Sequence, residues 1–109
     1  MKINVLGSEW SIEYRNTASD PLLKENDGYA DYTVRLIIIA NKREDAELID
    51  DEQRRKHTLR HEIVHAFLFE SGLAYSWEHP DAGHEETMVD WIALQFQKLQ
   101  KAFEEAGCL

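Results

Sequence analysis

The apolar residues of this 109-residue chain change their spacing near its middle. Before residue 41 they alternate with polar residues, as Trp10, Ile12 and Tyr14 do, which is the period of a strand with one buried face. After residue 50 they recur at every third or fourth position, which is the period of an amphipathic helix. This order, with strands first and helices afterwards, predicts an α+β fold.

The strand-forming part of the chain predicts about three strands. A hairpin over residues 3–15 is expected to turn at Gly7 and Ser8. Residues 16–31 are polar and predict a loop, and residues 32–40 predict a third strand. Both faces of that strand become apolar toward its end, so we expect it to be covered on both sides there.

Two helices are expected in the second part of the chain. The first begins at Asp50 or Asp51, either of which can act as its cap, and runs to about Ser71, with Gly72 after its end. The second runs over residues 84–106. Its apolar stripe is expected to consist of Met88, Ile92, Phe96, Leu99 and Phe103.

Charge, length and cysteine content limit the partners and the compartment. Twelve Lys and Arg residues against 21 Asp and Glu residues give a net charge of −9, so we expect neither nucleic acid nor a membrane surface as a partner. The longest apolar run, Leu36–Ala40, is far too short to cross a membrane. The length predicts one domain over residues 1–109. We expect it in the cytoplasm, because Cys108 cannot form an internal disulfide and the first residues do not have the pattern of a secretory signal. The oligomeric state is left open.

A metal-binding pattern lies inside the first expected helix, at His61-Glu62-Ile63-Val64-His65. Histidines four residues apart lie on one helix face, so both imidazoles can reach one metal ion. Glu62 is rotated by about 100° from His61 and is placed to take a proton from water rather than to bind the ion. The pattern predicts metal-assisted hydrolysis, with zinc as the cofactor.

The second helix offers a third ligand. Glu86 and Asp90 are four residues apart and share one face, so one carboxylate can bind the metal while the other accepts a hydrogen bond from a ligand histidine. Acidic residues are also common in the first turn of a helix, where they suit its dipole. The histidine pair needs a third metal ligand. We assign Glu86 to this role, and not its neighbour Glu85, because only Glu86 has Asp90 one turn later on the same face.

These two segments resemble the gluzincin pattern of thermolysin-type zinc metallopeptidases. The size of the chain and the order of its elements are similar to those of the minigluzincins and of small phage-encoded ImmA/IrrE-like metallo-endopeptidases, which leaves open a phage origin. The resemblance implies a small zincin-like domain with an active-site helix and a glutamate helix. It also implies zinc ligands at His61, His65 and Glu86, a general base at Glu62, and Asp90 as the hydrogen-bond partner of His61.

Several features stay open within this interpretation. The strand over residues 34–40 resembles the edge strand along which such enzymes pair with a peptide, and equally fits a core strand. An oxyanion-stabilising residue is not assigned: Tyr75, His79 and His84 are the nearest candidates, and each also fits a surface or packing role. His57 is expected at the surface. The predicted function is hydrolysis of a peptide bond in an unidentified protein or peptide; the alternative is a zinc-binding interaction module with little or no turnover.

Overall fold

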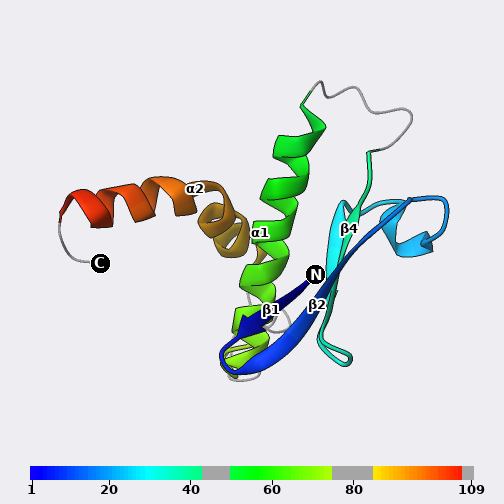
Figure 1. Ribbon diagram of the computed structural model, residues 1–109, viewed down its shortest axis with the longest axis horizontal. Coiled ribbons are helices and arrows are strands. Elements are labelled where there is room, and N and C mark those ends of the chain that lie inside the picture. Colours follow the sequence, from blue (N-terminus) through cyan, green and yellow to red (C-terminus); the bar gives the residue numbers. More distant parts are fainter. Residues whose placement is uncertain (43–49, 75–84, 107–109) are drawn as a thin grey trace.

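The computed structural model describes residues 1–42, 50–74 and 85–106, and these form an α+β fold (Figure 1). A four-stranded sheet packs against one long helix, and a second helix crosses that helix. The elements in chain order are β1 (Lys2–Val5), β2 (Ser8–Arg15), the short 3-10 helix η1 (Pro21–Leu23), β3 (Gly28–Asp31), β4 (Leu36–Ala40), α1 (Asp51–Glu70) and α2 (Glu86–Glu105). The fold class predicted from the sequence is therefore confirmed.

The sheet has the strand order β1-β2-β4-β3. β1 and β2 form the expected antiparallel hairpin, whose turn places Leu6 and Gly7 at positive φ angles of 49° and 91°. β2 then pairs in parallel with β4, and β4 pairs antiparallel with β3. β4 therefore lies inside the sheet and β3 lies at its edge.

The expected strand over residues 32–40 is wrong in its first half. Only Leu36–Ala40 is a strand; residues 32–35 form the turn of a second hairpin, and the expected loop over 16–31 contains β3. The Asp31 carboxylate accepts a hydrogen bond from the backbone N–H of Thr33, at 3.0 Å, and Arg35 adopts a φ of 52°, so the chain bends here. The sheet has four strands rather than three, and the edge strand is β3 rather than residues 34–40.

The two faces of β4 are both covered, as the sequence predicts. Ile37 and Ile39 face α1 and pack with Trp10 and other apolar residues of the hairpin. Ile38 faces the other side of the sheet, where Leu23 of η1 covers it. All four of these aliphatic side chains are fully buried. Burial on both faces makes β4 the rigid centre of the sheet.

Helix α1 begins and ends where the sequence predicts. The Asp50 side chain accepts a hydrogen bond from the backbone N–H of Gln53 at 3.1 Å, and Gly72, at a φ of 82°, follows the cap residue Ser71. Near the end of the helix, the Glu70 carboxylate accepts hydrogen bonds from Trp10 Nε1 at 2.8 Å and from Arg35 Nε at 2.6 Å. These hydrogen bonds lower the pKa of the Glu70 carboxyl group, and they fix the end of α1 to the sheet.

Helix α2 crosses α1 near its own start, and its second half extends away from the rest of the molecule (Figure 1). Its fully buried residues are Val89 and Ala93, whereas Phe96 is 50% exposed. The expected stripe through Met88, Ile92, Phe96, Leu99 and Phe103 is thus the buried face only in part: Met88, Ile92 and Leu99 are partly buried, and Ile92 and Phe96 line an apolar cleft with residues of α1. The side chain of Phe103 lies outside the described part of the structure. The expected start of this helix at residue 84 lies outside the described residues.

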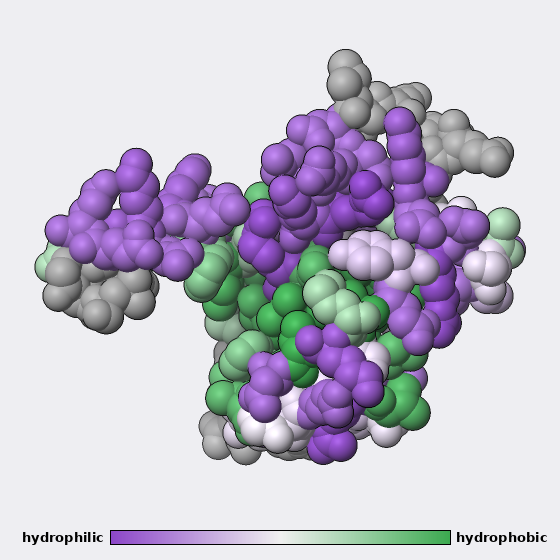
Figure 2. All heavy atoms as spheres, viewed as in Figure 1, coloured by the Kyte–Doolittle hydropathy of each residue, from purple (hydrophilic) through white to green (hydrophobic). Residues whose placement is uncertain are grey.

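The surface in Figure 2 is largely hydrophilic along the protruding half of α2, and apolar side chains gather near the centre of the molecule. Within the described parts of the chain, no helix has both the length and the apolar character needed to cross a membrane.

Candidate metal centre

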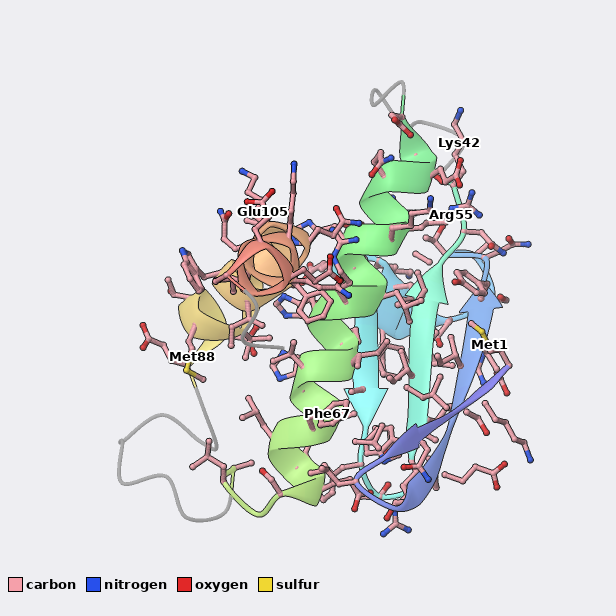
Figure 3. All side chains as sticks on the ribbon, turned by 60° about the vertical axis from the view of Figure 1, so that its left-hand side comes forward. Met1, Lys42, Arg55, Phe67, Met88 and Glu105 are labelled. Atoms are coloured by element: carbon pink, nitrogen blue, oxygen red, sulfur yellow. The ribbon has the colours of Figure 1, made fainter. Side chains whose placement is uncertain are left out.

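Five side chains from α1 and α2 form a row of alternating histidines and carboxylates. The three histidines are spaced by four residues on α1 and the two carboxylates by four residues on α2, so each set lies on one helix face. Figure 3 shows the side chains of the two helices meeting where they cross. We call this row the histidine–carboxylate ladder; its members, in order of contact, are His57, Asp90, His61, Glu86 and His65.

Every contact in the ladder is within hydrogen-bond distance. Nε2 of His57 and Nδ1 of His61 lie 2.9 and 3.1 Å from the same oxygen, Oδ1 of Asp90. Nε2 of His61 lies 3.2 Å from Oε2 of Glu86, and Nε2 of His65 lies 3.1 Å from Oε1 of the same carboxylate. The two Nε2 atoms are 3.1 Å apart. One end of the ladder therefore turns three potential ligand groups toward one point.

The convergent group matches the needs of a zinc ion. Among residues 1–42, 50–74 and 85–106, one group of three or more potential ligands lies close enough to share an ion: His61, His65 and Glu86, with ligand atoms within 4.8 Å of one another. Tetrahedral zinc holds nitrogen ligands at about 2.0–2.1 Å, which places ligand atoms about 3.3 Å apart. The two Nε2 atoms, 3.1 Å apart, are close to that value, and each lies 3.1 to 3.2 Å from a different oxygen of Glu86. Two imidazoles and one carboxylate also form a common catalytic zinc set.

Asp90 orients one of these histidines. Its carboxylate lies 3.1 Å from Nδ1 of His61. This contact favours the tautomer in which Nδ1 donates its hydrogen and Nε2 keeps a lone pair for a metal. Burial raises the pKa of Asp90, but the hydrogen bonds from His61 and His57 outweigh this and hold the pKa below its usual value. The carboxylate is therefore charged, as an acceptor of two N–H groups must be.

Glu62 lies on a different side of α1, turned toward the sheet. The residue is only 6% exposed, and its pKa is raised to about 7, chiefly by this burial; the nearby His61 lowers the pKa and the Glu86 charge raises it. A carboxyl group with a pKa near neutrality can both accept and release a proton. Glu62 lines a cleft with His61, His65 and Glu86 but is outside the convergent group, and its role as a general base stays a prediction.

Two adjoining clefts open on both sides of Glu62. They have volumes of about 290 and 410 Å³, and both are lined by His61, Glu62 and residues of the segment that leads into β3. Gly28 belongs to both clefts and lies so close to its neighbours that a Cβ atom would be 2.8 Å from the Ile38 carbonyl oxygen. This close approach brings the edge strand β3 beside the ladder, a feature that the sequence pattern does not reveal.

The structure brings together four of the five side chains predicted for the site, and it places Glu62 beside them. Glu85, in contrast, is exposed and lies outside the convergent group. His57, which was expected at the surface, is partly exposed there, with 32% of its side chain accessible, but its ring also contacts Asp90. Its position one turn before His61 was the available signal. Tyr75, His79, His84 and Cys108 lie outside the described residues.

Comparisons with protein-family models, with curated proteins and with solved structures find no match for this chain. The resemblance to gluzincins therefore depends on the motif residues and on the arrangement described above.

Proposed function

We propose that the chain is a small zinc-dependent metallopeptidase of gluzincin type, which hydrolyses a peptide bond in a protein or peptide of unknown identity. The observation that carries this proposal is the convergence of Nε2 of His61, Nε2 of His65 and the Glu86 carboxylate on one point. A purely structural zinc site would not need a buried glutamate beside it, and Glu62 is such a residue. The lone cysteine, which cannot form an internal disulfide, favours the cytoplasm as its compartment.

The ligand groups would be His61, His65 and Glu86, and zinc held there would supply a Lewis acid that activates water and polarises a carbonyl group. Asp90 keeps Nδ1 of His61 protonated and thereby keeps Nε2 unprotonated for its role as a ligand. Glu62 would accept the proton of the attacking water and deliver it to the amine that leaves. Because Glu86 is exposed, the convergent point is open to solvent and to substrate.

The edge strand β3 supports a peptide as the substrate. Among the strands that the structure describes, β3 pairs with β4 alone, and its residues line the cleft beside His61 and Glu62. An extended peptide can add to such an edge through main-chain hydrogen bonds. In this proposal β3 takes the part that the sequence assigned to residues 34–40.

Zinc titration of four proteins tests the metal site. Wild type is expected to bind one zinc per chain, Glu86→Ala to lose most of the affinity, and Asp90→Ala to lose roughly 10–100-fold. Glu85→Ala, the matched control, is expected to bind as wild type does, because Glu85 lies outside the ligand group. A wild-type protein that binds no zinc would overturn the proposal, and a larger loss in Glu85→Ala than in Glu86→Ala would overturn the ligand assignment.

The alternative is a zinc-binding interaction module with the same helix pair, which the small volume of the clefts favours. Cobalt substitution separates the two. An enzyme keeps one coordination position open, so a hydroxamate added to the cobalt protein is expected to change its visible absorption spectrum. Cleavage of a peptide library by wild type, and none by Glu62→Gln with unchanged zinc affinity, would then establish hydrolysis. An unchanged cobalt spectrum and intact peptides would favour the interaction module.

A further inference from the structure

His57 is the one member of the histidine–carboxylate ladder that has no part in the proposed metal site. It lies one helical turn before His61, and its Nε2 atom is 2.9 Å from Oδ1 of Asp90. That contact is shorter than the 3.1 Å contact between His61 and the same oxygen. The Asp90 carboxylate therefore has two histidine partners on α1, and not only the one that the sequence predicts.

His57 is poorly placed to bind a second metal ion. A metal between His57 and His61 would need both rings and Asp90 to converge on one point, as happens one turn further along. Within the described residues, the convergent group contains His61, His65 and Glu86, and His57 is not a member of any such group. The contact of His57 with Asp90 thus has the character of a hydrogen bond, in which Nε2 donates to a charged oxygen.

The hydrogen bond from His57 limits the rotation of its acceptor, the Asp90 carboxylate. Oδ1 of Asp90 has two lone pairs, and the N–H groups of His57 and His61 occupy both. The Asp90 side chain is 44% exposed, so without one of these partners its carboxylate is free to rotate and to bind water instead. Two histidines of one rigid helix, spaced by four residues, hold the oxygen between them.

We propose that His57 is a positioning residue of the metal site: by donating from Nε2 to Asp90 it fixes the carboxylate that sets the tautomer and orientation of His61. The inference depends on the proposed zinc site. His57 touches neither the convergent point nor the reacting atoms, and it acts on His61 only through Asp90. Its loss is therefore expected to weaken zinc binding by less than the loss of Asp90, about 3–10-fold against the 10–100-fold typical of direct partners of a ligand.

The first measurement uses the metal-free protein and does not require zinc at all. Nitrogen-15 NMR distinguishes an imidazole protonated at Nδ1 from one protonated at Nε2. In wild type His61 is expected to favour the Nδ1–H form, because Asp90, 3.1 Å from Nδ1, is held in place by His57 as well, whereas Glu86, 3.2 Å from Nε2, is 71% exposed. His57→Ala is expected to mix the two tautomers of His61. In His57→Gln the side-chain amide can still donate to Asp90, so the Nδ1–H form is expected to persist.

The second measurement is zinc affinity, with Lys56→Ala as the control for loss of an exposed side chain from the same turn of α1. His57→Ala is expected to bind 3–10-fold more weakly than wild type, while His57→Gln and Lys56→Ala bind within about twofold of it. Circular dichroism confirms in each case that the helices remain folded. Unchanged zinc affinity and an unchanged His61 tautomer in His57→Ala would overturn the inference.

A double variant tests whether His57 acts through Asp90. If it does, adding His57→Ala to Asp90→Ala is expected to weaken zinc binding no further, because the carboxylate through which His57 acts is already absent. An additional loss equal to that of His57→Ala alone would show that His57 acts independently, which contradicts the inference. If wild type binds no zinc, the proposed function fails, whereas the tautomer measurement still decides whether His57 positions Asp90 and His61.

Discussion

Helix α1 uses two of its faces in different ways. The face toward the sheet carries Leu59, Ile63 and Ala66, which pack against fully buried residues of β2 and β4. The face toward α2 carries the three histidines of the ladder, which meet Glu86 and Asp90. On the α2 side of this second interface, the fully buried apolar residues are Val89 and Ala93 among those that the structure describes.

The apolar interface and the polar ladder are expected to contribute differently to folding stability and to zinc binding. The free energy of apolar burial is proportional to the buried area and tolerates small displacements, so the sheet interface contributes stability whether or not zinc is bound. Hydrogen bonds between histidines and carboxylates depend on distance and direction, and they gain modest net free energy in water. We therefore expect changes at the sheet interface to act on folding with or without zinc, and changes of the ladder residues to act mainly on zinc binding.

The largest effect is expected from Ile37→Ala, on the sheet side. Ile37 is fully buried between the hairpin and α1, and removing a buried isoleucine side chain to the β-carbon costs about 2–5 kcal/mol of unfolding free energy. Urea unfolding with excess chelator and with excess zinc measures it, and the loss is expected to be equal in both. Val34→Ala is the control, because Val34 is 65% exposed. A loss that disappears with zinc would contradict the separation of the two interfaces.

The ladder was largely predictable from the sequence, whereas the sheet was not. Spacings of four residues determine which side chains share a helix face, so His61, His65, Glu86 and Asp90 could be grouped before their distances were known. The caps at Asp50 and Gly72 follow from equally local rules. Local rules do not say which helix face meets another, and so the contact between His57 and Asp90 was missed.

The edge strand was missed for a similar reason. Tyr32 and Val34 continue the alternation of the strand that follows them, so the pattern extends through a turn that the tertiary structure imposes. Arg35, which is not a glycine, adopts the left-handed conformation there and gives no turn signal in the sequence. The parallel pairing of β2 with β4, which places β3 at the edge, joins segments far apart in the chain.

Glu62 is a buried acid on α1, and its ionisation links the stability of the metal-free protein to pH. Its pKa is raised by burial from 4.5 to about 7, so between these values the unfolded chain is ionised while the folded chain keeps its proton. Stability is therefore expected to fall as pH rises from about 4.5 to 7. Glu62→Gln removes this penalty and is expected to be more stable than wild type at pH 8 by about 2–3 kcal/mol, with no gain at pH 4.

Thermal melts of both proteins with chelator, over this range of pH, measure the difference. Glu52→Gln is the control, because Glu52 lies on the exposed side of the first turn of α1. An equal gain at both pH values would show that the glutamine stabilises by packing and not by removing a buried charge.

Gly28→Ala tests the close contact of β3 with α1. The new methyl group would lie 2.8 Å from the Ile38 carbonyl oxygen and 2.9 Å from Cγ2 of Thr58, so the strand must shift. A cost of about 1–3 kcal/mol is expected in urea unfolding. Adding Thr58→Ser removes the second contact but not the first, and only part of the loss should return. Zinc affinity is expected to stay within about twofold, since the ligands lie on α1 and α2; a large loss would show that β3 supports them.

The smallest effects are expected on α2, and they decide which of its faces is buried. Val89 is fully buried, so Val89→Ala removes two methyl groups' worth of burial, about 1.5 kcal/mol. Phe96→Ala is expected to cost less than about 1 kcal/mol although it removes more atoms, because Phe96 is half exposed where the helix leaves α1. Urea unfolding of the metal-free variants gives both values. If Phe96→Ala cost more than Val89→Ala, the apolar stripe through residues 88, 92 and 96 would be the buried face after all. Glu86 and Asp90 would then be turned away from the histidines.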